Sequence, residues 1–298
     1  MRIMITGANG PAGLALGDQL TGTEHTVIGV DMDATANAYF ELIESICAAR
    51  EPQMITQLQE LVEAHQIDLL IPTVSDELPY VAAATEAGVF GNTVVAIGPH
   101  QAVAAAHDKY LTMQALAAQH VSIPAFALPS EFSNLDEAIA ALGTPLIIKP
   151  RVARGGRGVQ VVEAGETIDW EALDDSLVLQ EFASGIEYAP MVHHMLNEHE
   201  PLVVVVEKTE LKEGRVGNAV STELVSGPTV EDVAEVAASA VRGMGLKGAI
   251  DLDIRRLPDG RPVVLEINAR FGANSRRAPE ILSSVIASAH NSLARVGA

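Results

Sequence analysis

A pair of apolar segments near the end of the chain constrains the fold more than any other feature. The segments are Gly248-Ala-Ile-Asp-Leu-Asp-Ile254 and Val263-Val-Leu-Glu-Ile-Asn268, with Pro258-Asp259-Gly260 between them. Alternating segments on both sides of such a turn predict a β-hairpin. Successive side chains of a strand point to opposite faces, so Glu266 and Asn268 share a face, and the hairpin brings Asp253 near them.

Three oxygen ligands are therefore expected to converge on the hairpin. The carboxylates of Asp253 and Glu266 and the amide oxygen of Asn268 suit a hard divalent cation. Mg²⁺ usually binds a protein through one or two carboxylates together with substrate phosphates. The hairpin predicts a magnesium site beside a nucleoside triphosphate. Taken alone, the same pattern also fits a surface hairpin with solvated carboxylates.

A second segment favours phosphate binding. Pro145-Leu-Ile-Ile-Lys-Pro150 predicts a short buried strand that carries Lys149. The glycine-rich loop Arg151–Gly158 follows, and then a strand over Val159–Glu163. Glycines let backbone N–H groups approach phosphate oxygens, while a lysine supplies a mobile positive charge. The alternative is a basic surface turn.

A strand, a turn and a further strand follow in Ser176-Leu-Val-Leu-Gln-Glu-Phe-Ala-Ser-Gly-Ile-Glu187. In their order along the chain, the lysine, the glycine loop, this segment and the metal hairpin resemble the ATP-grasp superfamily. Members of that superfamily hold ATP between two α+β lobes. The resemblance covers residues 100–275, and Ile67–Glu77 is similar to the pre-ATP-grasp part of carbamoyl-phosphate-synthase-like ligases.

The resemblance implies roles for individual residues. Lys149 and Arg270 are the expected catalytic residues, with Arg270 facing the transferred phosphoryl group or the acceptor carboxylate. The implied ATP-binding residues are Lys109, Lys149, the loop glycines Gly155, Gly156 and Gly158, the adenine hinge Gln180, Glu181 and Ala183, the ribose-binding Glu187, and Lys208 as a further γ-phosphate contact. The implied metal ligands are Asp253, Glu266 and Asn268, which hold Mg²⁺ or, as a substitute, Mn²⁺.

The N-terminal segment supports a rival interpretation. A strand over Arg2–Thr6, the turn Gly7-Ala-Asn-Gly-Pro-Ala-Gly13, a helix over Leu14–Leu20 and a strand from His25 to Asp31 form a dinucleotide-binding pattern. This glycine spacing is typical of NAD(P)-binding epimerases and reductases. Such enzymes need a Tyr-x-x-x-Lys pair, and none of the four tyrosines has a lysine four residues later. The resemblance implies instead a Rossmann-like domain that shapes the acceptor site.

The remaining segments complete the expected organisation. Thr73–Glu77 follows a strand over Ile67–Pro72 and is expected to cap a helix that begins near Leu78. A strand over Thr93–Ile97 ends the first domain, and helices are expected over Asp108–Gln119, Val230–Arg242 and Arg277–Ala294. The expected fold class is α/β and α+β. A Rossmann-like pre-ATP-grasp domain (1–100) precedes a two-lobed ATP-grasp fold, with lobe A at 101–180 and lobe B, which carries the metal site, at 181–298.

Two adjacent histidines, His193 and His194, suggest a metal pair at first sight. Neighbouring residues of a strand point to opposite faces and cannot easily share one ion. We therefore expect one buried and one exposed histidine instead of a metal site.

Composition limits the class of protein. A chain of 298 residues with 48% hydrophobic residues can bury a large core, and a net charge of −20 argues against a nucleic-acid partner. The single cysteine, Cys47, excludes an intramolecular disulfide. The first residues lack the apolar run of a signal peptide, and no run is long enough to span a membrane. We expect a cytoplasmic enzyme, with a homodimer as an open option.

The resemblance implies an ATP-dependent ligase that acts on a small-molecule carboxylate and an amine. The carboxylate attacks the γ-phosphate of Mg-ATP to give an acyl phosphate, and the amine then displaces phosphate to form an amide-type C–N bond. A carbamoyl-phosphate-synthase-type subunit that phosphorylates bicarbonate is the alternative within the same superfamily.

Overall fold

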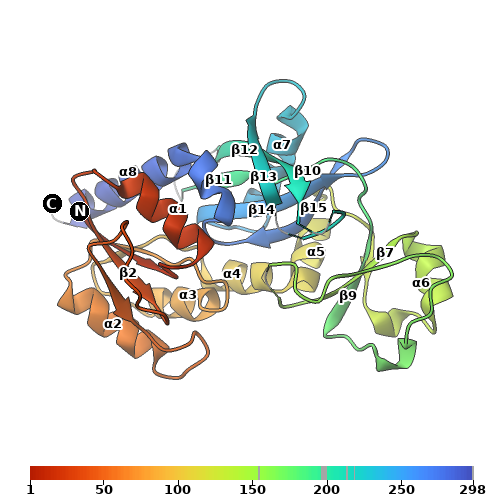
Figure 1. Ribbon diagram of the computed structural model, residues 1–298, viewed down its shortest axis with the longest axis horizontal. Coiled ribbons are helices and arrows are strands. Elements are labelled where there is room, and N and C mark those ends of the chain that lie inside the picture. Colours follow the sequence, from red (N-terminus) through yellow and green to blue (C-terminus); the bar gives the residue numbers. More distant parts are fainter. Residues whose placement is uncertain (154, 196–199, 213, 218, 297–298) are drawn as a thin grey trace.

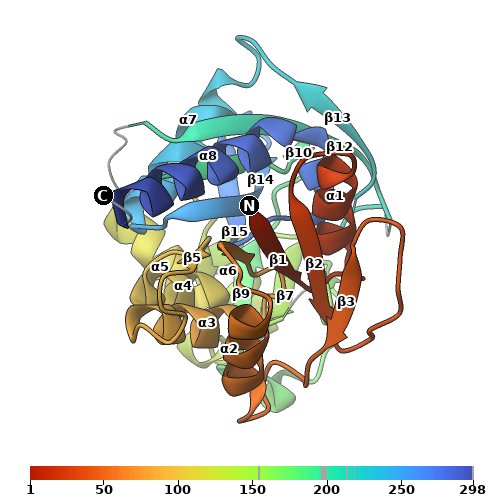
Figure 2. The ribbon, with the colours of Figure 1, turned by 90° about the vertical axis from the view of Figure 1, so that its left-hand side faces the viewer.

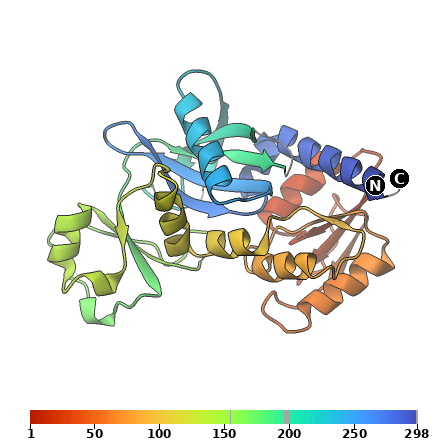
Figure 3. The same ribbon diagram turned by 180° about the vertical axis from the view of Figure 1, so that it is seen from behind.

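The computed structural model describes residues 1–153, 155–195, 200–212, 214–217 and 219–296. Their strands form three sheets, which lie in a row along the molecule (Figure 1). A parallel sheet lies at one end and a small antiparallel sheet at the other, with the largest sheet between them. The view from behind shows helices α4 (His100–His107) and α5 (Lys109–Ala118) running from the first part of the molecule toward the last (Figure 3).

The first sheet has the strand order β3-β2-β1-β4-β5, with all neighbours parallel. Its strands are β1 (Arg2–Thr6), β2 (Thr26–Asp31), β3 (Leu42–Ser45), β4 (Leu69–Ile71) and β5 (Val94–Val95), and its helices are α1 (Pro11–Leu20), α2 (Met54–Ala64) and α3 (Leu78–Glu86). Alternation along β1 explains the layers: Ile3 and Ile5 pack against α1, while Met4 faces α2 and α3. The helix α1 lies on one side of this sheet, and α2 and α3 lie on the other (Figure 2). The order reverses between β1 and β4, where such sheets bind ligands.

The second sheet is small, antiparallel and ordered β6-β9-β7-β8. Its elements are β6 (Phe126–Ala127), α6 (Leu135–Leu142), β7 (Leu146–Pro150), β8 (Gln160–Val162) and β9 (Leu177–Glu181), with short 3-10 turns at Pro129–Glu131 and Trp170–Ala172. Ala138 and Leu142 of α6 pack on Leu146 and Ile148 of β7. One face of the sheet is therefore covered by its own helix.

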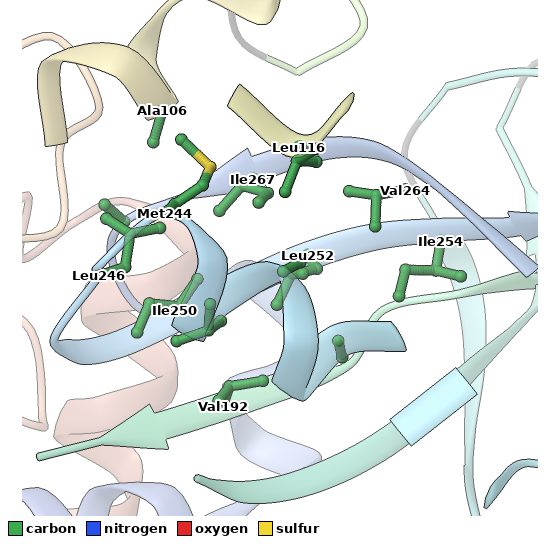
Figure 4. Packing of buried hydrophobic residues seen from close by; sticks show 14 of the residues in the cluster. Ala106, Leu116, Val192, Met244, Leu246, Ile250, Leu252, Ile254, Val264 and Ile267 are labelled. Atoms are coloured by element: carbon green, nitrogen blue, oxygen red, sulfur yellow. The ribbon is translucent and has the colours of Figure 1, made fainter. Parts of the chain in front are cut away.

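The third sheet is ordered β10-β12-β11-β14-β15, and β13 pairs with β12. Its strands are β10 (Glu187–Tyr188), β11 (Met191–His194), β12 (Leu202–Leu211), β13 (Ala219–Val225), β14 (Gly248–Arg256) and β15 (Pro262–Asn268), and the accompanying helical elements are α7 (Glu231–Gly243), the 3-10 turn Ala273–Arg277 and α8 (Pro279–Val296). Leu252 and Ile267 pack with Leu116 of α5 on one face (Figure 4). On the other face, Ile281 and Leu282 of α8 join the core of the first sheet.

This coverage on both faces corrects the prediction for the histidine pair. His193 and His194 are both buried, with 3% and 5% of their surfaces exposed. The Nδ1 of His193 lies 2.7 Å from the hydroxyl of Ser284 on α8, and the Nδ1 of His194 lies 3.0 Å from the carbonyl of Leu246. The expectation of one exposed histidine was wrong because β11 is an interior strand between two helical layers.

The predicted cap of α3 was also wrong. Glu77 precedes Leu78 at the start of the helix, but no side chain caps it. The Glu77 carboxylate turns inward and accepts hydrogen bonds from the hydroxyl of Thr6 and the N–H of Val74. Through Glu77 the loop is therefore hydrogen-bonded to the end of β1, and it does not cap the helix that follows it.

None of the helices in the described part of the chain is both long and apolar enough to cross a bilayer.

Candidate functional site

A cavity of about 720 Å³ has walls from all three sheets. Of the residues that the sequence assigned to the site, Gly158 alone lies outside this wall. Those in the wall are Lys109, Lys149, Gly155, Gly156, Gln180, Glu181, Ala183, Glu187, Lys208, Asp253, Glu266, Asn268 and Arg270. The fold thus brings together residues that are up to 161 positions apart, from Lys109 to Arg270.

Lys109 owes its place to the start of α5. The Asp108 carboxylate accepts hydrogen bonds from the N–H groups of Tyr110 and Leu111, which caps the helix, and it pairs with Arg151. This fixes the first helical residue beside the glycine loop. The ammonium of Lys109 donates to the carbonyl of Ala153 at 3.0 Å and lies 3.2 Å from a Glu266 carboxylate oxygen.

Lys149 projects from β7 into the same cavity and is 7% exposed. Its Nζ donates to the side-chain oxygen of Gln180 at 2.8 Å and to the carbonyl of Leu265 at 3.2 Å. Burial lowers the pKa of the Lys149 ammonium to about 8, while the nearby Glu266 carboxylate opposes that shift. The lysine is a buried cation held by neutral oxygens and is available to an anionic group.

The glycine loop adopts the backbone that its composition predicts. Gly155, Gly156 and Gly158 have φ angles of +62°, +70° and +75°, in the region that favours glycine. A Cβ on Gly156 would lie 3.4 Å from the Cα of Gly217, so this loop closes against the β12–β13 connection. Gly158 lies against the ring of Pro150 and outside the cavity wall, so its expected part in the loop that closes on the phosphates stays a prediction.

The three residues of the expected adenine hinge, Gln180, Glu181 and Ala183, have different surroundings. Gln180 is buried, and its amide holds Lys149. Glu181 pairs with Ala125 through both its N–H and its carboxylate, at 2.8 and 3.0 Å. Ala183 is buried in a small apolar cluster. All three line the cavity, but the side chain of Gln180 is engaged with the lysine.

Lys208 and two carboxylates form a compact charged group. The Nζ of Lys208 lies 2.6 Å from an oxygen of Glu187 and 2.6 Å from an oxygen of Asp253. Burial alone would lower the pKa of Lys208, but the two carboxylates outweigh it and raise the pKa above its usual range. The ammonium therefore stays charged and joins the expected ribose acid to an expected metal ligand.

The metal hairpin has the predicted register. Asp253 of β14 pairs with Glu266 of β15, Asp251 pairs with Asn268, and a bulge follows Asp253. Within the described part of the chain, no three His, Cys, Asp or Glu side chains cluster as a metal site. A cation here would rely on two carboxylates and the amide of Asn268, which are hard oxygen donors. These three residues fit a magnesium ion that also binds phosphate oxygens.

Arg270 links the hairpin to the first domain. Its Nε donates to the hydroxyl of Ser75 at 3.2 Å, and an Nη donates to the side-chain oxygen of Asn268 at 3.0 Å. The other Nη donates to the carbonyl of Phe271 at 2.8 Å. The guanidinium thus touches a predicted metal ligand and the loop after β4 at the same time.

The turn after β1 forms the far wall of the cavity. Gly7 has a φ of +61°, and a side chain there would strike Thr73 and Val74. Beneath the turn, burial raises the pKa of the Glu77 carboxyl to about 7, although hydrogen bonds from Thr6 and Val74 oppose the shift. The turn and the loop after β4 are therefore one packed unit at the carboxyl end of the first sheet.

Among the cavity-wall residues that the sequence did not assign to the site are Ser75, Asp251 and Arg255. Strand alternation could have found Asp251, which shares a face of β14 with Asp253. Burial raises the pKa of its carboxyl to about 7, and the charge of Asp253 adds to the shift. Ser75 carries no local signal, because only the packing of the first domain brings it to Arg270.

Comparison with known proteins decides the family. The model of the ATP-grasp domain matches residues 106–274, which is more than half of the chain. The chain belongs to the ATP-grasp family. The family predicted from the sequence is therefore confirmed.

Individual relatives agree with this family. A D-alanine–D-alanine ligase of Cupriavidus pinatubonensis is 29% identical over 188 residues, which cover 57% of this chain and 56% of the relative. A carbamoyl phosphate synthase large chain of Bifidobacterium longum is 21% identical over 261 residues, which cover 82% of this chain and 23% of the relative. The match thus spans less than two thirds of either relative.

A solved structure shows the same fold over the whole chain. The D-alanine–D-alanine ligase of Bacillus anthracis has a TM-score of 0.66 at 15% identity and covers 99% of this chain and 98% of that chain. The predicted fold class, a Rossmann-like domain followed by a two-lobed ATP-grasp fold, is confirmed.

Proposed function

We propose that this protein is an ATP-dependent ligase that activates a carboxylate as an acyl phosphate and joins it to an amine. One observation carries the proposal: a single cavity holds both a group of lysines beside acidic residues and an end where the loops of the first domain meet Asp251 and Arg270. We name Lys109, Lys149 and Lys208 with Glu187, Asp253 and Glu266 the phosphate end. We name Gly7, Gly10, Ser75, Asp251 and Arg270 the acceptor end.

In this proposal ATP lies between the second and third sheets. Lys109 and Lys149 contact its phosphates, and Glu187 accepts hydrogen bonds from its ribose hydroxyls. The glycines of the Gly155–Gly156 segment bring backbone N–H groups to the phosphates, as their positive φ angles allow. The closed loop also excludes water, which would hydrolyse an acyl phosphate.

Asp253, Glu266 and Asn268 would hold Mg²⁺, or Mn²⁺ in its place. The ammonium groups of Lys208 and Lys109 lie 2.6 and 3.2 Å from the carboxylates of Asp253 and Glu266, so these lysines would turn toward the phosphates when the ion binds. When bound, the ion would neutralise charge on the phosphates.

The proposed reaction has two steps. A carboxylate oxygen of the first substrate attacks the γ-phosphorus and breaks its bond to ADP, which gives an acyl phosphate. The amine then attacks the acyl carbon, the C–O bond to phosphate breaks, and the amine loses a proton. The guanidinium of Arg270, which contacts Ser75 and Asn268, stabilises the negative charge that develops on the acyl oxygens.

A screen of phosphate release tests the proposal. Mg-ATP is combined with pairs drawn from the standard amino acids, D-alanine, dipeptides and hydroxy acids, and with bicarbonate alone, and products are identified by mass spectrometry. We expect release only when a carboxylate and an amine are both present, with a product that has lost one water. Release with bicarbonate alone would support carbamoyl-phosphate-type chemistry instead.

Ligand-induced stabilisation separates this function from the dinucleotide-binding alternative. A ligand that binds only the folded state raises its stability. We expect Mg-ADP to raise the Tm and NAD⁺ to leave it unchanged. In the structure, Asp31 accepts a hydrogen bond from the N–H of Asn9 at 2.9 Å, so this acid already serves the turn. A shift with NAD⁺ alone would reverse the ranking.

A further inference from the structure

Asp251 differs from the other acidic side chains that the structure describes in the cavity wall. Glu187, Asp253 and Glu266 each have a lysine ammonium within 3.2 Å. Glu181 accepts a hydrogen bond from a backbone N–H at 3.0 Å. The carboxylate of Asp251 has no comparable partner.

Neither carboxylate oxygen of Asp251 accepts a hydrogen bond from a described residue. Oδ1 is buried and has no hydrogen-bond partner among the described residues. Oδ2 lies 3.6 Å from an Nη of Arg270, too far for a hydrogen bond. A buried carboxylate without donors is strongly unfavourable. Because 12% of the side chain is exposed and the residue lines the cavity, a molecule bound in the cavity can reach the exposed part of the carboxyl group and donate hydrogen bonds to it.

The chain also keeps space for this carboxylate. Gly272 has a φ of −95° and a ψ of 173°, a backbone that any residue can adopt. A Cβ at this position would nevertheless overlap the carboxyl group of Asp251. Glycine is therefore required here by the neighbouring carboxylate and not by the conformation of the chain.

We infer that Asp251 binds the amino group of the second substrate. The inference rests on the proposed ligase function and defines that substrate as an amine whose N–H groups donate to a carboxylate. The position suits the reaction, because Asp251 pairs with Asn268 across the hairpin and lies beside Arg270. An amine held there lies next to the group that faces the acyl phosphate.

Asp251→Asn tests the inference, because asparagine keeps the shape and removes the charge. The probe is the amino acid that supports the fastest phosphate release in the screen above. We expect its KM to rise roughly ten- to hundredfold, the usual contribution of a charge-assisted hydrogen bond. The KM for ATP should change little. Asp136→Asn, on the exposed face of α6, is the matched control and should leave both constants unchanged.

A positioning role for Asp251 through Arg270 would give a different result. Acyl phosphate formed without the amino acid can be trapped as a hydroxamate with hydroxylamine. If Asp251→Asn lowers hydroxamate formation as much as amide formation, the residue supports Arg270 and the inference is overturned. An unchanged KM for the amino acid also overturns it. If no amino acid in the screen releases phosphate, the proposed function fails first, and this inference fails with it.

Gly272→Ala gives an independent test in case Asp251→Asn does not fold. Its methyl group should displace the carboxylate and raise the KM for the amino acid. In an Asp251→Ala background the added methyl group has nothing to displace, so Gly272→Ala should then have little further effect. Equal effects in both backgrounds would contradict the inference.

Discussion

The two ends of the cavity are built differently. At the phosphate end, Lys208 contacts two carboxylates at 2.6 Å and Lys109 contacts a third at 3.2 Å, so charges are matched closely. At the acceptor end, the walls are glycines, a serine and one arginine, and Asp251 lacks a close partner. The contrast supports our proposal that one end is formed for ATP, while the other leaves its polar groups to the second substrate.

The largest expected effect concerns the phosphate end. Glu266→Gln and Asn268→Ala should each lower kcat by at least about a thousandfold, since a bound metal ion contributes several kcal/mol to catalysis. Both residues line the cavity, so the thermal unfolding temperature should change little. Steady-state phosphate release measures the loss, and Glu210→Gln, at an exposed position of β12, is the control. Normal turnover in both variants would sink the metal assignment.

The second prediction concerns the acceptor end, which is held together by the buried Glu77. The folded pKa of this carboxyl is about 7, above its ordinary value of 4.5. Between these values the folded protein binds more protons than the unfolded chain, so stability falls as the pH rises through the window. We expect Glu77→Gln to remove this loss, worth about 3 kcal/mol, in urea unfolding measured across that pH range.

His193 serves as a control, because its effect on the pH dependence of stability has the opposite sign. Burial lowers the pKa of its imidazole to about 4, so its unfolded form binds more protons between that value and 6.5. Stability due to this residue therefore rises with pH, and His193→Gln should remove a gain instead of a loss. Parallel stability profiles for wild type and Glu77→Gln would show that Glu77 is not the source.

A smaller effect is expected for Lys149→Met, which keeps the length of the side chain and removes its charge. The KM for ATP should rise and kcat should fall, with kcat/KM lower by roughly tenfold, because the charge acts before and during phosphoryl transfer. The loss should be the same with every acceptor. Lys247→Met, whose ammonium lies 3.4 Å from His194 outside the cavity wall, is the control. Selective loss with one acceptor would move Lys149 to the acceptor end.

The smallest effect is expected in the glycine loop. Gly156→Val should lower kcat about fivefold, because a β-branched residue resists the φ of +70° and crowds Gly217. Gly165→Val is a matched control, since Gly165 has a φ of +84° and open space around it. Both variants carry similar backbone strain, so equal kcat values for them would mean that the loop does not close on phosphate.

Local patterns predicted the hairpin and the glycine loop of the phosphate end, while Lys109, Glu187 and Lys208 were implied only by the family resemblance. The alternation of β14 and β15 about one turn sets the pairing of Asp253 with Glu266, which the structure has. The positive φ angles of Gly155 and Gly156 agree with the glycine-rich sequence, because glycine adopts this conformation more easily than any other residue type. Gly158 shares that conformation but packs on Pro150, because conformation alone does not say what a residue faces.

The acceptor end could not be predicted in this way. The contact of Arg270 with Ser75 joins residues from two sheets, and neither residue carries a local pattern for it. The burial of both His193 and His194 likewise depends on helices that follow far later in the chain. Alternation along the strand predicts that these two side chains lie on opposite faces of the sheet. It does not predict which elements cover each face.

The sequence by itself indicated the ATP-grasp family, through a resemblance that the family match confirms, and it predicted many of the strands and helices and the residues of the phosphate end. The hairpin and the glycine loop follow from periodicity, turns and spacing, which act over a few residues, while Lys109, Glu187 and Lys208 were implied by the resemblance. Only the tertiary structure decided that the turn after β1, the loop after β4 and Arg270 form one wall, and that Asp251 lacks a close partner there. Such contacts depend on how three sheets pack, since burial and hydrogen bonding between distant segments are properties of the whole fold.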